Sequence, residues 1–147
     1  MKIIFLDIDG VLNSRESFKE LKTMWILSQE NIKQLNRIIE ATGAKIVISS
    51  SWRNRKEIKD NLNDYLINDC GIKGEIIGKT PLVGFNRRRG LEIKTWLDDW
   101  QGEPIEQFVI LDDDSDMIPL MDRLCKTNIQ VGLTKEKADE AIRFLNE

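Results

Sequence analysis

The sequence predicts an α/β protein of one domain, residues 1–147, with a three-layer arrangement of a parallel sheet of about five strands and helices on both faces. Three observations predict this class. Short apolar runs alternate with helical patterns through the whole chain. The runs are rich in branched aliphatic residues, as buried parallel strands are. The length of 147 residues is enough for one domain with a substantial core.

Composition and charge exclude several classes of protein. Hydrophobic residues make up 41% of the chain and charged residues 32%, which is typical of a globular domain. No apolar run approaches about 18 residues, so no membrane span is expected. Carboxylates interrupt the first apolar stretch too early for a signal peptide, and we expect a cytoplasmic protein. The net charge of −3 carries no overall basic signature for nucleic acid.

The chain contains no histidine and two cysteines, Cys70 and Cys125. The lack of histidine excludes Ser-His-Asp and Cys-His catalysis and every His-ligated metal site. Acid and base chemistry must then come from carboxylates, Lys, Tyr or Cys. Two isolated cysteines indicate neither a disulfide framework nor a zinc site.

The first third of the chain predicts strand, flap, helix and strand. Residues 3–6 form an apolar run typical of a buried strand, and the polar residues 13–25 indicate a turn and a flap. Ser28 is placed to cap a helix that Gly43 ends. Residues 45–49 then predict a second buried strand.

The middle and last thirds continue the alternation. Helical spacing predicts helices over residues 55–68 and from about residue 89 to Gly102 and Pro104, with a weaker strand over residues 75–78 between them. The remaining predicted elements are a strand over residues 107–111, a short helix over 119–124, a strand over 128–131, and a last helix capped by Thr134.

The first strand leads directly into two carboxylates and a glycine, Asp7, Asp9 and Gly10. Open α/β folds bind ligands at the carboxyl ends of their strands, so both aspartates are expected at a ligand crevice. Two carboxylates fixed there repel each other unless a cation or a shared proton intervenes. The D-x-D-G pattern also occurs in ordinary turns, so the rest of the chain has to decide its meaning.

Two other predicted strands also end in polar side chains. A serine run, residues 49–51, follows the second strand, and an acidic run, residues 112–114, follows the fourth. Such runs are commonly helix caps or solvated turns. This acidic run follows a buried apolar strand immediately. If the chain changes direction across the sheet after the third strand, both runs become neighbours of the first two aspartates.

Four carboxylates would then meet in one pocket: Asp7, Asp9, Asp112 and Asp113. A pocket of oxygen ligands without Cys or His favours Mg²⁺ over zinc. Magnesium in such a pocket normally binds a phosphate as well. Ser49 or Ser50 could donate to that phosphate, and Arg89, at a predicted helix start, could neutralise a phosphoryl group.

The motif order LDIDG, VISS, the Arg89 region and LDDD resembles that of the haloacid dehalogenase (HAD) superfamily of phosphohydrolases, over residues 3–116. More narrowly, FLDIDGVLN, ISSSWR, RGLEIKTWL and VILDDD resemble the HAD domain of Swiss Army Knife RNA repair proteins. The resemblance implies a Rossmann-like core. The segments between the motifs leave room for little or no cap, so the crevice could admit a nucleic acid end or a nucleotide.

By this resemblance, Asp7 is the nucleophile that forms an aspartyl-phosphate. Asp9 is the general acid for the leaving oxygen and then the base for the hydrolytic water. A magnesium ion bound by this pair with Asp112 and Asp113 reduces the repulsion between the nucleophile and the phosphate. Asp116 is the alternative to Asp113 as the second acidic residue of its motif.

The resemblance also assigns the phosphate and substrate contacts. Ser49 binds the phosphoryl oxygens, and the serine run leaves Ser50 as an alternative. Arg89 occupies the basic position, with Arg88 as the alternative. Arg53, just beyond the serines, is expected to contact the substrate, and the arginines near residues 53–55 and 87–89 suit backbone phosphates.

Three alternative interpretations compete with the phosphohydrolase, and the residues argue against two of them. Residues 74–80 resemble a phosphate-binding G-x-x-x-x-G-K-[ST] loop, but the pattern is one residue short and Pro81 follows. A receiver domain would carry its phosphoaccepting aspartate after the third strand, and no Asp lies in residues 75–80. A non-catalytic HAD-like domain with a nucleic-acid-binding or regulatory role is the alternative function; both aspartates of the first motif are intact.

Overall fold

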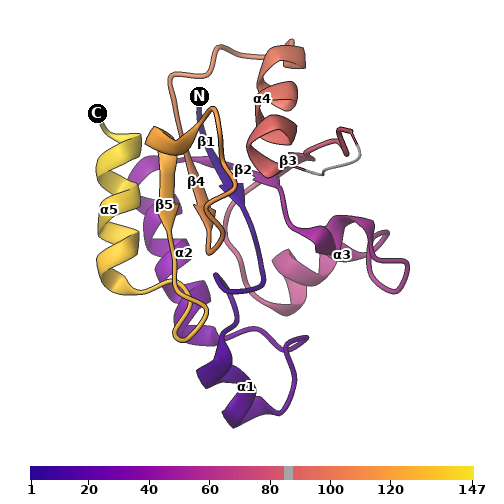
Figure 1. Ribbon diagram of the computed structural model, residues 1–147. Helices are drawn as coiled ribbons and strands as arrows, with labels where there is room; N and C mark the ends of the chain where they lie inside the picture. The colour runs from indigo at the N-terminus through magenta and orange to yellow at the C-terminus, as the bar shows by residue number, and fades with distance from the viewer. Residues whose placement is uncertain (85–87) are drawn as a thin grey trace.

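The computed structural model describes residues 1–84 and 88–147. Within them, five strands form one parallel sheet in the order β3-β2-β1-β4-β5 (Figure 1). The strands are β1 (Lys2–Leu6), β2 (Lys45–Ile48), β3 (Ile76–Lys79), β4 (Gln107–Asp112) and β5 (Leu124–Lys126). The α-helices are α1 (Arg15–Leu21), α2 (Gln29–Thr42), α3 (Leu62–Asp64), α4 (Arg89–Asp99) and α5 (Lys135–Leu145). Three further helical segments are the 3₁₀ helices η1 (Ser51–Asn54) and η3 (Met121–Arg123) and the π-helix η2 (Tyr65–Asp69).

The strand order shows that the chain changes direction after the third strand, which is the condition under which the motifs become neighbours. The chain moves from β1 outward to β2 and β3, and then returns to place β4 and β5 on the other side of β1. Backbone hydrogen bonds extend the sheet past the end of β1. Asp7 N donates to Leu111 O at 3.0 Å, and Ser49 N donates to Leu6 O at 3.0 Å. The carboxyl ends of β1, β2 and β4 therefore lie side by side.

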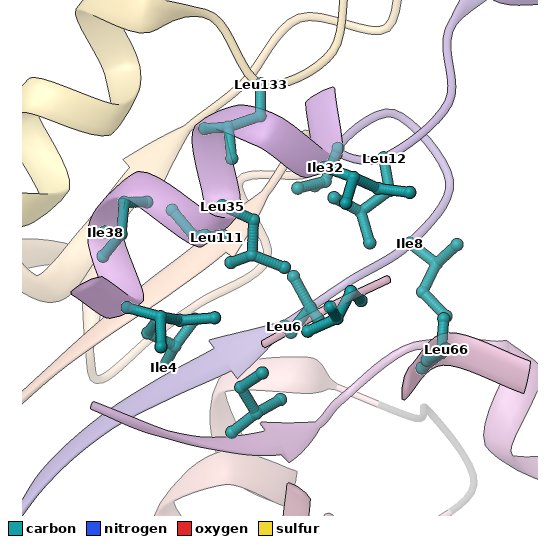
Figure 2. Close-up of a cluster of buried hydrophobic side chains, with 14 of the residues drawn as sticks. Ile4, Leu6, Ile8, Leu12, Ile32, Leu35, Ile38, Leu66, Leu111 and Leu133 are labelled. Carbon is teal, nitrogen blue, oxygen red and sulfur yellow. The ribbon is translucent and has the colours of Figure 1, made fainter. Parts of the chain in front are cut away.

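The sheet separates two hydrophobic clusters. On one face, Ile4 and Leu6 pack with the apolar sides of α2 and α5 (Figure 2). On the other face, Ile3 and Phe5 pack with α4. The ring of Trp96 lies edge-on to that of Phe5, with the ring centroids 5.5 Å apart. The alternation of side chains along β1 thus fills both layers, because successive strand residues point to opposite faces. This is the predicted α/β fold of three layers.

Local signals set both ends of α2 and the start of α5 as predicted. Ser28 Oγ accepts a hydrogen bond from Asn31 N at 3.2 Å at the start of α2, and Gly43 ends that helix with a φ of 70°. Thr134 Oγ1 accepts from Lys137 N at the start of α5. These caps satisfy backbone groups that a helix terminus otherwise leaves unpaired.

Three elements differ from the sequence prediction. The expected helix over residues 55–68 is replaced by a run of turns followed by the short α3 and η2. The last strand lies at Leu124–Lys126, whereas residues 128–131 form a turn closed by a bridge between Asn128 and Gly132. The expected flap contains a helix, α1, capped by Ser14. None of the described helices is long and apolar enough to cross a membrane.

Candidate active site

Three carboxylates gather where β1 and β4 end. Asp7 follows β1, Asp112 is the last residue of β4, and Asp113 comes next. One carboxylate oxygen of each lies within 4.8 Å of the others. Asp7 is 3% exposed and Asp112 is fully buried. The sheet fixes both residues through their backbones, since Asp7 N donates to Leu111 O and Thr127 N donates to Asp112 O at 2.9 Å.

Arg89 bridges two of these carboxylates. Its guanidinium nitrogen Nη1 lies 3.0 Å from Asp7 Oδ2 and 2.7 Å from Asp112 Oδ2. Arg88, the alternative from the sequence, is exposed and precedes α4. Of these two arginines, the structure thus brings Arg89 to the site. Arg87, from the same cluster, lies outside the described residues.

Gly90 positions the start of α4, and with it Arg89. Its N–H donates to Asp116 O at 3.0 Å. A Cβ at this position would overlap the backbone of Met117 and Ile118. The absence of a side chain therefore lets the helix approach the loop after β4 closely enough for its arginine to reach the carboxylates.

Burial and mutual repulsion shift the pKa values of the site. Burial raises the pKa of Asp7, the charge of Asp112 raises it further, and Arg89 opposes both. Burial and then Asp112 raise the pKa of Asp113 as well. For Arg89, burial alone would lower the pKa, but the two aspartates together hold it above its ordinary value. The single guanidinium thus leaves the carboxylates under-compensated, a situation that favours binding of a further cation.

The donor set fits magnesium. The cluster offers three carboxylate oxygens and neither nitrogen nor sulfur, which suits a hard divalent cation. Asp116 lies outside the cluster and is exposed, so Asp113 is the second acidic residue of this motif that reaches the site. Gly10 permits this arrangement: its φ is 81°, and a Cβ there would overlap the carboxylate of Asp113.

Asp9 was predicted as a fourth metal ligand, but its carboxylate is not part of the cluster. Its Oδ1 accepts hydrogen bonds from Asn13 Nδ2 at 2.8 Å and from Trp52 Nε1 at 3.1 Å. The two donors hold the carboxyl group on the side of Trp52. The first two aspartates of the motif therefore have different surroundings.

Ser49 and Ser50 are separated by their hydrogen bonds. Ser50 Oγ accepts from Trp52 N at 3.2 Å and so caps η1. Ser49 Oγ is buried, and within the described part of the chain it has no hydrogen-bond partner. A buried hydroxyl without a partner is costly unless a ligand satisfies it. Ser49 is therefore the serine available to a phosphate beside Asp7.

Arg53 is not available for the substrate contact expected from the sequence. Its side chain is 3% exposed and lies 3.1 Å from Glu92 on α4. The same guanidinium donates to the carbonyl oxygens of Ser49, Ser50 and Thr80 at 2.7 to 2.9 Å. Burial lowers the pKa of Arg53, and Glu92 opposes that shift. The side chain therefore stabilises the backbone of Ser49 and Ser50 from the interior of the protein.

Sequence reasoning missed Asn13 as a structural part of the site. Asn13 Oδ1 accepts from Gly10 N at 2.9 Å, while its Nδ2 donates to both Asp9 and Met24 O. The motif FLDIDGVLN already contained this residue, but a single asparagine in a turn carries no sign of a contact with Met24. Trp52 was missed for the same reason, because its contact with Asp9 is tertiary.

These features define a class of protein. The site lies at the point between β1 and β4 where the strand order reverses. It combines paired aspartates after the first strand, a serine after the second, and a basic residue facing an acidic pair. This is the arrangement of the haloacid dehalogenase superfamily. Residues 3–138 match the family described as the HAD domain in Swiss Army Knife RNA repair proteins, and the chain belongs to this family. This membership supports a phosphohydrolase at the level of the superfamily. Comparisons with curated proteins and with solved structures found no match.

Proposed function

We propose that this protein is a magnesium-dependent phosphohydrolase that acts on a phosphomonoester, with a nucleic acid end or a nucleotide as the substrate class. The observation that carries the proposal is the cluster of Asp7, Asp112 and Asp113, in which the first two carboxylates are buried and bridged by Arg89. The family description, which names RNA repair, supports the nucleic acid part of the substrate class.

The residues divide the chemistry between them. The Asp7 carboxylate would attack phosphorus in line, forming an aspartyl-phosphate while the bond to the leaving oxygen breaks. Asp9 would protonate that oxygen and then take a proton from the hydrolytic water. The buried hydroxyl of Ser49 and the guanidinium of Arg89 would bind the phosphoryl oxygens, placing donors where negative charge concentrates. Asp7, Asp112 and Asp113 would hold Mg²⁺, which supplies charge neutralisation.

The decisive experiment compares the wild-type protein with Asp7→Asn for phosphate release from an aryl phosphate, with Mg²⁺ and with EDTA. We expect magnesium-dependent release by the wild type and a loss of about 10³-fold or more in the variant, because the amide cannot act as the nucleophile. Asp98→Asn, an exposed position on α4, is the matched control and should retain activity. Wild-type activity in Asp7→Asn would contradict the assignment of the nucleophile.

No phosphate release from any substrate by a folded wild-type protein would contradict the hydrolase. That result would favour the alternative of a HAD-like domain that binds nucleic acid or regulates a partner without catalysis.

A further inference from the structure

A shallow pocket opens directly beside Asp9, on the side where Asn13 and Trp52 hold its carboxylate. Its lining residues are Asp9, Met24, Trp25, Trp52 and Arg55, and its volume is about 270 Å³. Trp25 is 41% exposed, in contrast to the buried Trp52 below it. The carboxylate cluster and Ser49 are not among the residues that line this pocket.

The pocket is lined by planar groups in contact with one another. The ring centroids of Trp25 and Trp52 lie 4.8 Å apart with the planes tilted by 45°. The guanidinium carbon of Arg55 lies 5.3 Å from the centroid of the Trp25 ring. Indole rings and guanidinium planes are the groups on which proteins stack nucleobases, because every base offers a π-face.

Hydrogen bonds connect the residues that line the pocket to Asp9, the proposed general acid. Asn13 Nδ2 donates both to Asp9 Oδ1 and to Met24 O, at 2.8 and 2.9 Å. Trp52 Nε1 donates to the same oxygen of Asp9. The loop that carries Trp25 is therefore placed relative to Asp9 by two side chains that also hold the acid.

A second tie comes from the region after η1. The hydroxyl of Tyr65 donates to Trp25 O at 2.6 Å. Burial raises the pKa of Tyr65 to about 12, so the phenol stays protonated and keeps this donor. Trp25 is thus an exposed aromatic residue on an anchored loop, which suits a preformed binding surface.

The position of the acid decides which part of a substrate meets the pocket. A general acid must lie within hydrogen-bond reach of the leaving oxygen, so the leaving group extends toward Asp9 while the phosphoryl group faces Asp7 and Ser49. A pocket of this volume has room for one ring system.

We infer that Trp25, Trp52 and Arg55 form a subsite for the nucleobase of the terminal nucleotide that carries the scissile phosphate. This inference rests on the proposed phosphohydrolase function and assigns its leaving-group specificity. The base stacks on the exposed indole and guanidinium, and the sugar oxygen released from phosphorus lies at Asp9. Arg55 also offers a positive charge to the neighbouring backbone phosphate.

The test measures kcat/KM on four dinucleotides that carry a terminal phosphate at the 3′ or the 5′ end, each with either a normal or an abasic terminal residue. We expect the wild type to prefer the base-bearing compound by about tenfold, a factor typical of one stacked base. Trp25→Ala should bring this ratio near one through loss on the base-bearing compound, with the abasic compound unchanged within about twofold. Trp25→Phe should retain most of the preference.

Phe18→Ala is the matched control, since it removes another exposed aromatic side chain, on α1, without touching the pocket. The inference is overturned if the wild type shows no preference for the base, or if Trp25→Ala leaves the ratio unchanged or lowers both rates equally. Thermal melting verifies that each variant is folded.

A binding arm separates this inference from the proposed function. Asp7→Asn protein, titrated calorimetrically with the base-bearing and abasic dinucleotides, should show the same preference for the base, and the double variant with Trp25→Ala should lose it. If the wild type hydrolyses none of the compounds, the proposed function fails and this binding preference alone decides the subsite. Equal affinity for both compounds then contradicts it.

Discussion

At the scale of single residues, two adjacent serines illustrate how one hydroxyl is left for a ligand. The side chain of Ser50 is occupied by the backbone N–H of Trp52, while Ser49 Oγ is buried without a partner among the described residues. Both side chains are essentially excluded from water. The first hydroxyl stabilises the fold, and the second is suited to stabilise a bound phosphate.

This difference predicts opposite effects of two alanine substitutions. Ser49→Ala should lower kcat/KM for an aryl phosphate by about 10-fold or more through loss of a donor to the phosphoryl group, with little change in the free energy of unfolding. Ser50→Ala should instead cost about 1 kcal/mol of stability through loss of a cap. Chemical denaturation and steady-state kinetics on both variants check the pair. Equal loss of stability would contradict the assigned roles.

At the scale of elements, the ion pair between Arg53 and Glu92 connects the segment after β2 to α4. Both side chains are 3% exposed, and the arginine also binds three backbone carbonyl groups at the ends of β2 and β3. These contacts hold the loop of Ser49 and the helix of Arg89 in one arrangement. A buried pair of this kind is costly to break, because the remaining partner stays charged and out of water.

Arg53→Met should therefore lower the free energy of unfolding by about 3–5 kcal/mol, because Glu92 loses its buried counter-charge. Arg55→Met is the matched control, since Arg55 is exposed, and it should change stability by less than about 1 kcal/mol. Urea denaturation of both variants provides the measurement. A stable Arg53→Met protein that loses activity only on substrates with a base would instead support the direct substrate contact expected from the sequence.

At the scale of the whole molecule, the negative charge of the site is concentrated at the carboxyl ends of the central strands β1 and β4. The chain carries 25 acidic and 22 basic residues, so the net charge of −3 does not distinguish it from many globular proteins. Three of the carboxylates nevertheless meet at one edge, two of them buried. Repulsion there opposes folding, and a bound divalent cation should relieve it.

Magnesium should therefore stabilise the folded protein in the absence of substrate. A ligand that binds only the native state at 100 times its Kd adds about 2.7 kcal/mol. We expect Tm to rise with added Mg²⁺ and to fall back with EDTA. Asp113→Asn should reduce the rise, and Asp98→Asn should retain it. An equal rise in all variants would indicate nonspecific binding of the ion elsewhere.

Much of the fold followed from local patterns. A few neighbouring residues are enough to predict the apolar run of β1, the capped α2 and the acidic residues at the end of β4. The prediction was wrong where tertiary contacts override local preference. Trp52 contacts Asp9 and Arg53 binds backbone carbonyl groups in the interior, and the residues after them form turns in place of the expected helix. β5 is a three-residue edge strand, too short for its pattern to stand out.

The sequence by itself determined the class of fold, the order of the motifs and the residue types that can hold a phosphate and a magnesium ion, because these depend on chemistry and spacing along the chain. Only the tertiary structure decided where these side chains lie. It left the hydroxyl of Ser49 without a partner among the described residues while Ser50 caps η1, it brought Arg89 and not Arg88 to the carboxylates, and it placed Arg53 in the interior. Those choices depend on hydrogen bonds and burial between segments far apart in the chain, which no local pattern records.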